Sequence, residues 1–284
     1  MASAQAEVIS SEPLNLSIRG LGSAFGAEVR GLTWGSPAPD VVHQLTIALR
    51  RHLLLVLRGM PSPTHDQLDD FFRPFGRLLL ETRDGTFHYG KFSGNDQEVV
   101  HRKSDGNYVV STDVGAAELG WHNDQFHKPQ LKILSVLEAV DFEPGATPTC
   151  FRDMYTAYEM LPAALRAQLE FKQSINFDPK LPAPEQLPRL CDAMHPIFTA
   201  HPHSGRRALY ICDFTAAIAG TDPARSDTQM AQLRRHAEHN APQYVHHWEV
   251  GDIVVWDNVG VQHRRDAIPP RQRRKLRVFE GVAE

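Results

Sequence analysis

A histidine and an aspartate two positions apart, His122 and Asp124, are the first residues of this sequence whose types and spacing could bind a metal ion. On a β-strand both side chains would point to the same face, because side chains alternate along a strand. An imidazole and a carboxylate would then reach the same point in space. By itself the pair is a weak signal, since a chain with 15 histidines contains such a spacing by chance. An isolated pair of this kind is more commonly a surface histidine beside a solvated aspartate.

A third residue, His263, could complete a metal site with this pair. His263 follows the apolar run Ile253–Trp256 and the polar residues Asp257 and Asn258, which predict a buried strand that ends in a turn. Two histidines and one carboxylate from separate strands can occupy one face of an octahedral metal ion. This arrangement is typical of non-haem Fe(II), because the free positions accept a bidentate co-substrate and O₂. Zinc accepts the same residues with one open position, so a zinc-dependent hydrolase is the alternative.

Two arginines, Arg273 and Arg274, follow His263 at the start of the predicted last strand, Lys275–Val282. A buried guanidinium can bind a carboxylate through two parallel hydrogen bonds, as a dicarboxylic co-substrate would require at the end remote from the metal. Most arginine pairs are simply solvated. The position of this pair, on a strand that returns to the core just after the candidate ligand, favours a functional role.

Other histidines are weaker candidates. His236 and Glu238 lie in the predicted helix Asp227–Asn240, where residues two apart diverge. His247 and Glu249 are expected on a strand and could share a face, but no third ligand follows them at a suitable spacing. The remaining histidines are expected to be capping, core or surface residues: His43, His52, His65, His195 and His201.

The elements that must position these residues are mainly strands. Alternating or continuous apolar runs predict a hairpin or strands at Leu14–Leu32, Leu53–Leu57, Leu131–Val140, Tyr244–Val250, Ile253–Trp256 and Lys275–Val282. Strands separated by long connecting segments favour a β-sandwich or barrel with helices packed outside. Gly, Asp, Ser and Asn enrich the segment Asp84–Leu119, which is predicted to form loops that could cover a site.

Four helices are predicted from periodicity and end signals. Asp40 is expected to cap a helix that runs to about His52. Thr64 and Gln67 have the spacing of a capping box ahead of a helix that ends at Gly76. Two further helices are expected at Tyr155–Phe171 and Asp227–Asn240, with a proline-rich connection at Phe177–Leu190 between them.

Composition excludes several classes of protein. The 284 residues, 42% of them hydrophobic, suit one globular domain spanning the whole sequence. The net charge of −4 gives no electrostatic reason to expect nucleic acid or an anionic membrane as a partner, and the Arg271–Arg277 segment is interpreted as strand. The sequence shows neither a membrane-helix run nor a secretory signal in Met1–Pro13. Three scattered cysteines fit a reducing cytoplasm: Cys150, Cys191 and Cys212. A small-molecule substrate is the expected partner, and a homo-oligomer stays open.

Several motifs together resemble the taurine dioxygenase/2,4-D dioxygenase family of Fe(II)- and 2-oxoglutarate-dependent oxygenases. They follow the family order across most of the chain, and their combination is more specific than any one motif. The matching pieces are Trp121-His122-x-Asp124, Thr149 in Pro-Thr-Cys-Phe-Arg-Asp-Met-Tyr, His195-Pro, Thr199-x-His201-Pro, Ser204-Gly205-Arg206, Trp248, Gly251-Asp252-x-Val254-Val255-Trp256-Asp257-Asn258, His263 and Arg274.

The resemblance implies a mainly β fold, a double-stranded β-helix (jelly roll) flanked by helices. It implies His122, Asp124 and His263 as iron ligands, with Arg274 and Thr149 on the distal carboxylate of 2-oxoglutarate. The family reaction uses O₂ and converts 2-oxoglutarate to succinate and CO₂. It usually hydroxylates a substrate carbon, and desaturation of the substrate is also possible. Two alternatives use the same cluster, namely a zinc-dependent hydrolase and a non-catalytic jelly-roll binding protein.

The substrate contacts depend on the register of the last strand. If Arg274 faces inward, so do Leu276 and Val278, whereas Lys275 and Arg277 face out. The opposite register would bury Lys275, which costs several kcal/mol, so the first register is favoured. Many relatives have an anion-binding arginine where this register places Val278. We therefore expect a larger, less charged organic substrate rather than taurine or another small sulfonate.

Two further expectations concern the surroundings of the metal. Trp256 should be buried in or beside the core, because an oxidising centre needs a shielded, apolar pocket. Five residues are expected to face the substrate: His88, Tyr89, Gln125, Phe126 and Val278.

Overall fold

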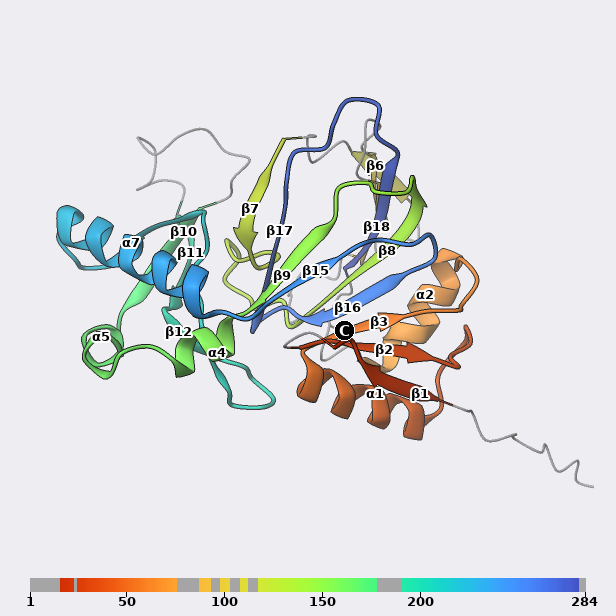
Figure 1. The fold of residues 1–284 in the computed structure, drawn as a ribbon, viewed down its shortest axis with the longest axis horizontal. Helices are drawn as coiled ribbons and strands as arrows, with labels where there is room; N and C mark the ends of the chain where they lie inside the picture. Colours follow the sequence, from red (N-terminus) through yellow and green to blue (C-terminus); the bar gives the residue numbers. More distant parts are fainter. Residues whose placement is uncertain are drawn as a thin grey trace, which may run out of the picture.

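Two largely antiparallel β-sheets face each other across an apolar core, with helices packed outside them (Figure 1). The computed structural model describes residues 16–22, 25–75, 87–92, 98–102, 108–111, 117–177 and 191–280. This arrangement is the predicted mainly β jelly-roll architecture with helical insertions.

The large sheet has nine strands and combines both ends of the chain. Its order is β1 (Ser17–Gly20), β2 (Ala27–Arg30), β3 (Leu54–Leu57), β16 (Ile253–Asp257), β8 (Leu134–Phe142), β18 (Arg274–Glu280), β4 (Phe87–Phe92), β5 (Glu98–Arg102) and β6 (Tyr108–Ser111). β2 and β3 are parallel, and the other neighbours are antiparallel. The last strand, β18, therefore pairs with β8 in the middle of the sheet, which places it within the core.

The prediction of loops over Asp84–Leu119 is wrong for the parts that the structure describes. β4, β5 and β6 fall in this range and extend the large sheet beyond β18. Each strand contains aromatic or β-branched residues, which fit a pleated surface. The polar residues between them suggested loops because they outnumber the short apolar runs in this stretch.

The small sheet has four antiparallel strands and carries two of the candidate ligands. Its order is β15 (Gln243–His246), β9 (Thr149–Asp153), β17 (Val261–Arg265) and β7 (Leu119–His122). β17 pairs with β7 so that His263 lies directly opposite His122. Strands that are far apart in the sequence thus bring two imidazoles to one place.

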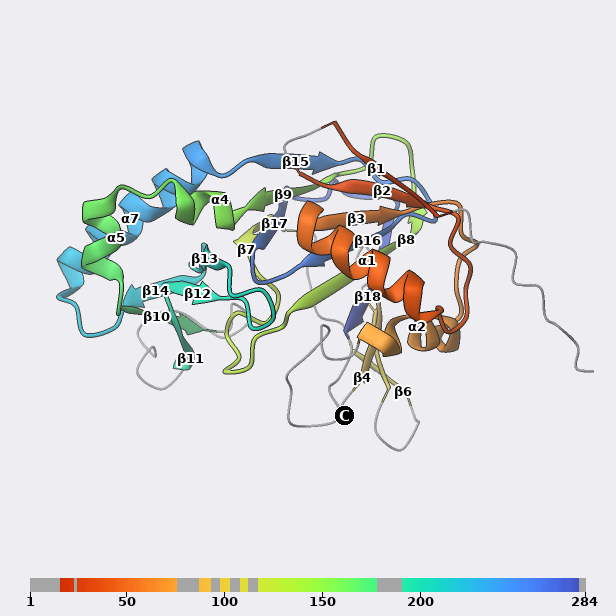
Figure 2. The ribbon, with the colours of Figure 1, turned by 90° about the horizontal axis from the view of Figure 1, so that it is seen from below.

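Helices lie against the large sheet and beyond one end of the two sheets (Figures 1 and 2). α1 (Pro39–His52) packs on the outer face of the large sheet, where its apolar face meets β3 and β16. α2 (His65–Phe72) and a short 3-10 helix (Arg73–Phe75) follow it. Two further small sheets, β11-β10-β14 and β12-β13, lie beside three helices. The helices are α4 (Met154–Glu159), α5 (Ala163–Leu169) and α7 (Pro223–Asn240). The five strands of these two sheets are β10 (Gln173–Phe177), β11 (Cys191–Pro196), β12 (Phe198–Ala200), β13 (Arg207–Leu209) and β14 (Thr215–Ile218). No helix in the described part of the chain is long and apolar enough to cross a membrane.

The helix ends test the predicted caps. Thr64 and Gln67 form the expected capping box, since the Thr64 amide donates to Gln67 Oε1 at 2.9 Å and the Gln67 amide donates to Thr64 Oγ1 at 3.2 Å. Asp40 does not cap α1. Pro39 begins that helix and Asp40 lies in its first turn, because the fixed φ of proline suits the first helical position.

Two other helix boundaries differ from the prediction. The helix expected at Tyr155–Phe171 is two helices, α4 and α5, because Pro162 interrupts the hydrogen-bond ladder. α7 begins four residues before the predicted Asp227, where the Asp222 side chain accepts a hydrogen bond from the Arg225 amide at 3.2 Å. Gly76 and residues 178–190 lie outside the described residues.

The core between the two sheets contains the predicted tryptophan. Trp256 is fully buried. Its ring lies edge-on to Phe151 of the facing sheet, with 5.4 Å between ring centroids, and 5.0 Å from the His263 ring. The prediction that Trp256 is buried in the core is confirmed, and its ring also lies beside the candidate ligand His263.

The register of β18 is the one that the burial argument favoured. Arg274 and Leu276 are buried in the core, while Arg273 is exposed and Lys275 is only partly buried. Arg277 faces the other way, as predicted, but it is buried rather than solvated. It pairs with Glu138 and donates to the Pro63 carbonyl at 2.7 Å, because the segment before α2 covers this face of the sheet.

Candidate functional site

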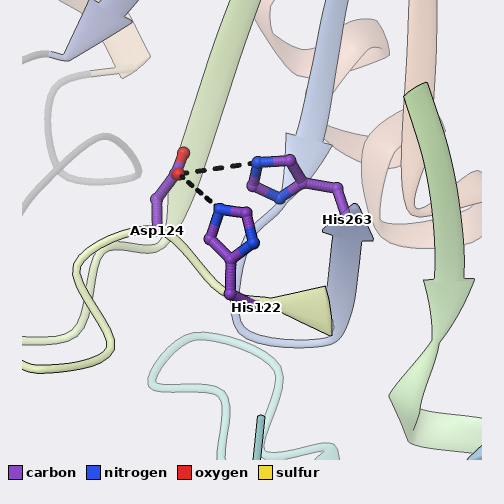
Figure 3. A group of neighbouring side chains, drawn as sticks. All are labelled: His122, Asp124 and His263. Atoms are coloured by element: carbon purple, nitrogen blue, oxygen red, sulfur yellow. Dashed lines mark ion pairs between the residues drawn. The ribbon is translucent and has the colours of Figure 1, made fainter. Parts of the chain in front are cut away.

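Three side chains, His122, Asp124 and His263, converge where the end of β7 lies beside the middle of β17 (Figure 3). Their ligand atoms all lie within 4.8 Å of one another. Asp124 Oδ1 is 3.9 Å from His122 Nε2 and 3.7 Å from His263 Nε2, which is too long for hydrogen bonds. Among the described residues, this is the one group of three or more histidine, cysteine or acidic side chains with such a geometry.

Asp124 reaches the cluster from a turn and not, as predicted, from the strand of His122. β7 ends at His122, and Asp124 begins the following turn. Asn258, which is fully buried after β16, holds this turn in place. Its Oδ1 accepts from the Asp124 amide at 2.9 Å, and its Nδ2 donates to the Asp124 carbonyl at 3.0 Å. The sequence motif contained Asn258, but its role could not be assigned from the sequence.

Hydrogen bonds set the orientation of the ligand atoms. His122 Nδ1 lies 2.8 Å from the Gly120 carbonyl, which can only accept. The proton therefore resides on Nδ1, and the lone pair of Nε2 faces Asp124. Asp124 Oδ2 accepts from Ser135 Oγ at 2.6 Å and from Lys132 Nζ at 3.1 Å. The other carboxylate oxygen, Oδ1, is thereby directed at the two imidazoles.

The charges of the cluster suit a metal site. Burial and the neighbouring His122 lower the pKa of His263 to about 3, so its imidazole is neutral at ordinary pH. Burial alone would raise the pKa of Asp124, but the Lys132 ammonium, the two imidazoles and the Ser135 hydroxyl together hold this pKa well below its usual range. Neutral imidazoles and an ionised carboxylate are the protonation states that metal binding requires.

The depressed pKa of His263 should make the metal-free fold sensitive to acid. The unfolded chain takes up a proton near the ordinary imidazole pKa of 6.5, whereas the folded protein resists protonation until about pH 3. Stability is therefore lost as the pH falls through this window. From about pH 7.5 to about pH 5, we expect His263 to lower the free energy of unfolding by about 2 kcal/mol. Urea unfolding of metal-free wild type and His263→Gln measures this, and equal losses in both proteins would contradict it.

Arg274, which is almost fully buried, forms a second part of the candidate site. Its Nε donates to the Thr147 carbonyl at 2.8 Å and its Nη2 donates to Thr149 Oγ1 at 3.0 Å. Trp248 Nε1 donates to the same hydroxyl oxygen at 3.0 Å. Burial and the neighbouring Arg265 lower the pKa of Arg274 to about 9. A cation in such surroundings favours the approach of an anion.

Arg273 does not share this environment. Its side chain is 62% exposed and lies 3.4 Å from Asp141. Of the two arginines left open by the sequence, the structure therefore buries Arg274 and leaves Arg273 at the surface. Trp248 was part of the family-like motif, but only the structure shows its contact with Thr149.

The predicted substrate residues are only partly visible. Phe126 is buried and stacks on Phe214, with 5.7 Å between ring centroids and an angle of 17° between the planes. Phe214 lies edge-on to His122 at 6.1 Å. Gln125 is half-buried and has a left-handed backbone with φ 56°. Sequence reasoning missed Phe214, which stands in no spacing pattern with the metal ligands.

Three other predicted substrate residues lie outside the described side chains. His88 and Tyr89 belong to β4, whose backbone pairs with the end of β18. Val278 belongs to β18, where its backbone pairs with Leu137. Their role in substrate binding stays a prediction.

The competing histidine pairs lie apart from the cluster. His236 is on α7 with Nε2 2.8 Å from the Ala157 carbonyl, and Glu238 lies 3.5 Å from Arg152. His247 and Glu249 follow β15, which ends at His246, so the strand expected for them is wrong.

The remaining histidines have structural contacts or lie at the surface. His195 is buried with Nε2 2.8 Å from the Lys128 carbonyl. His201 is buried, and its Nδ1 accepts from the His203 and Ser204 amides. His43 is exposed and His52 is half-buried, while the side chain of His65 lies outside the described residues.

Comparison with known proteins points to one class of enzyme. Residues 17–279 match the family described as "Taurine catabolism dioxygenase TauD, TfdA family". The pentalenolactone F synthase of Streptomyces avermitilis is 32% identical over 291 residues, covering 93% of this chain and 94% of that protein. The alpha-ketoglutarate-dependent 2,4-dichlorophenoxyacetate dioxygenase of Cupriavidus pinatubonensis is 31% identical over 242 residues. The match covers 79% of this chain and 82% of that protein.

A solved structure has the same fold. The crystal structure of a taurine dioxygenase from Burkholderia xenovorans has a TM-score of 0.71 at 24% identity, covering 96% of this chain and 90% of that one. Fold and family match together define a dioxygenase that uses 2-oxoglutarate, which is alpha-ketoglutarate. The chain belongs to the TauD/TfdA family of 2-oxoglutarate-dependent dioxygenases.

Proposed function

We propose that this dioxygenase holds Fe(II) through His122, Asp124 and His263, and binds the distal carboxylate of 2-oxoglutarate through Arg274 and Thr149. The observation that carries the proposal is the cluster of two buried imidazoles and one partly buried carboxylate, on a fold that also buries Arg274 in its core. This pairing of a metal triad with a buried guanidinium is what a dicarboxylic co-substrate requires.

The three residues fit Fe(II) by their chemistry. His122 presents the lone pair of Nε2, because Nδ1 is bound to the Gly120 carbonyl. Asp124 offers a single oxygen, because Ser135 and Lys132 hold the other. Two neutral nitrogens and one carboxylate oxygen are the donors of the facial triad. Bound iron supplies the redox chemistry that activates O₂, and the apolar surroundings of Trp256 and Phe151 exclude water from it.

Thr149 is suited to donate to the co-substrate. Its oxygen already accepts two hydrogen bonds, from Arg274 Nη2 and from Trp248 Nε1. The hydroxyl hydrogen must therefore point towards a third group, and a carboxylate oxygen can accept it. Arg274 adds a positive charge to the same place, and a charge-assisted bond of this kind contributes about 1.5–3 kcal/mol.

The alternatives explain fewer of the observations. A zinc hydrolase would use the same cluster but would have no use for a buried Arg274 bound to Thr149. A non-catalytic jelly-roll protein has no need to bury His122, Asp124 and His263 together or to hold their protonation states. Three relatives that match most of this chain are named as a synthase or as alpha-ketoglutarate-dependent dioxygenases.

The proposal is tested by the metal content and the co-substrate turnover of the purified protein. Reconstituted without O₂, the chain should bind a single Fe(II). On exposure to O₂, it should convert 2-oxoglutarate slowly to succinate without any substrate. Zinc should occupy the site without supporting this turnover. Iron binding without any succinate formation, or hydrolase activity that depends on zinc, would overturn the proposal.

We further propose that the substrate is a larger, less charged molecule than taurine. In β18, Leu276 follows Arg274 on the inner face, while Arg277 points outward to Glu138. The aromatic pair Phe126 and Phe214 beside His122 offers apolar contact. One relative is named for pentalenolactone F, a compound larger than taurine. His88, Tyr89, Gln125 and Val278, with the region 84–119, are proposed to complete the contacts.

A substrate screen that follows succinate tests this choice. We expect larger, weakly charged compounds to increase succinate formation several-fold over the substrate-free rate, and taurine and other small sulfonates to leave it unchanged. Hydroxylation and desaturation are distinguished by the mass of the product. Efficient turnover of taurine would contradict the proposed substrate class and leave the iron and co-substrate assignment intact.

The remaining expectations are proposals as well. The whole chain is proposed to act as one domain on a small molecule, without a nucleic-acid or membrane partner. A cytoplasmic location is supported by the free thiols of Cys150 and Cys212, both buried.

A further inference from the structure

Two buried amide side chains lie next to the candidate metal ligands in the sequence. Asn123 stands between His122 and Asp124, and Gln262 directly precedes His263. Asn123 is 1% exposed and Gln262 is 0% exposed. Side chains alternate along a strand, so Gln262 points to the face of β17 opposite His263. Its Nε2 donates to Asn123 Oδ1 at 2.9 Å. The two segments that carry the ligands are therefore bonded to each other through side chains that supply no ligand atom.

The neighbours of Gln262 fix the direction of this bond. Its Oε1 accepts from Arg152 Nε at 3.0 Å and from Arg152 Nη2 at 2.6 Å. A guanidinium has no acceptor, so the atom that faces it is the amide oxygen. Gln262 Nε2 also donates to the Ile211 carbonyl, which can only accept. Both hydrogens of Nε2 are therefore used, one by Ile211 and one by Asn123. An ionised glutamate at this position could form neither bond.

Asn123 extends the link to the turn between β16 and β17. Its Nδ2 donates to the Asn258 carbonyl at 2.6 Å and lies 3.4 Å from the Val261 carbonyl. Asn258 is also the residue that holds the turn of Asp124. The bonds of Asn123 and Gln262 thus connect the turn of Asp124, the end of β7 and the start of β17.

The strand pairing shows what this link adds. Among the described residues, β17 and β7 pair at two positions, with a register shift between them. The pair of His263 with His122 is the last one, because β7 ends at His122. In an antiparallel pair, Gln262 and Asn123 are the residues that would stand opposite each other next. Their side-chain bond therefore continues the connection between the two chains where the ladder stops.

We propose that Asn123 and Gln262 are positioning residues whose amide–amide bond fixes the spacing between His263 and the segment of His122 and Asp124. This inference rests on the proposed function. A site whose ligands are already held in place binds its metal more tightly, because binding then imposes less order on the chain. Loss of the groups that orient metal ligands costs about 10–100-fold in metal affinity.

The deciding variant is Gln262→Glu. It keeps the size of the side chain and the acceptor for Arg152, but it loses both donors and sets two oxygens against each other at Asn123. Its added negative charge would by itself tighten the binding of a cation, so weaker binding has a geometric cause. In calorimetric titrations without O₂, we expect Mn(II) to bind at least about tenfold more weakly than in the wild type. The visible absorption of bound Co(II), which depends on the arrangement of its ligands, should change as well.

Two further variants separate positioning from general damage. Gln229→Glu is the matched control, because Gln229 is a buried glutamine on α7 that has no part in these bonds. It should leave the Mn(II) constant unchanged. In the double variant Asn123→Ala/Gln262→Glu, the loss of affinity should be smaller than the product of the two single losses, because both changes break the same bond.

The outcomes decide between this inference and its alternatives. Unchanged Mn(II) binding by a folded Gln262→Glu protein, checked by circular dichroism, would overturn the inference. Single losses that simply multiply in the double variant overturn it too, and an unaltered Co(II) spectrum counts against it. If Gln262→Glu does not fold, Gln262→Met, which has a similar length and no charge, is titrated in its place. Failure of the wild type to bind Mn(II), or binding that survives His263→Ala, would instead contradict the proposed function.

Discussion

Replacing His263 with alanine is expected to abolish iron binding and, with it, the conversion of 2-oxoglutarate to succinate. His263 lies directly opposite His122 on the paired strand and supplies one of only three donors in the cluster. Loss of a group that merely orients a ligand costs about 10–100-fold in metal affinity, so loss of a ligand should cost more than about 100-fold. Iron stoichiometry after anaerobic reconstitution and the rate of succinate formation measure the effect.

A control separates this result from general damage. His43 is exposed on α1, and His43→Ala should retain full iron content and turnover. Because His263 is buried, circular dichroism and urea unfolding must show that His263→Ala is folded. A folded His263→Ala variant with undiminished iron and turnover would rule out His263 as a ligand.

Replacing Arg274 with alanine should raise the apparent constant for 2-oxoglutarate by about tenfold or more while the iron content stays intact. The variant loses the charge that faces the distal carboxylate and the donor that fixes Thr149 at 3.0 Å. Metal binding should survive, because none of the three candidate ligands bonds to Arg274 in the contacts described above. Titration of 2-oxoglutarate against succinate formation, with iron measured in parallel, provides both quantities.

Arg273→Ala is the matched control, since the neighbouring arginine is mostly exposed and pairs with Asp141 at the surface. It should leave the 2-oxoglutarate constant unchanged. Arg274→Lys keeps the charge but loses the planar fork, so its constant should lie between those of wild type and Arg274→Ala. If Arg273→Ala raises the constant and Arg274→Ala does not, the co-substrate assignment is wrong.

The sequence determined much about this protein where local physics governs the outcome. Alternation along β18, with the cost of burying Lys275, was enough to choose Arg274 over Arg273 as the inward residue. The reciprocal spacing of Thr64 and Gln67 was enough to predict a capping box, because both bonds lie within one turn. The order of short motifs, none specific alone, identified His122, Asp124 and His263, which the structure brings together.

Other features depended on contacts between distant parts of the chain, which a local pattern cannot show. Asp124 points at the imidazoles because Asn258, far along the sequence, holds its turn. Arg277 faces outward as predicted, but it is buried because the segment before α2 covers that face of the sheet. β4 pairs with the edge that β18 provides, and β5 and β6 extend the sheet by pairing in turn with β4 and β5.

Lys132 shows the same division most clearly. In the sequence it is a single charged residue in an apolar stretch, for which a solvated position is the usual expectation. Only the packing of β8 against the turn of Asp124 buries it and places its ammonium on the carboxylate. The sequence thus determined which residue types meet at the candidate metal site. The tertiary structure decided their orientation and their protonation states, because these follow from burial and from hydrogen bonds across the fold.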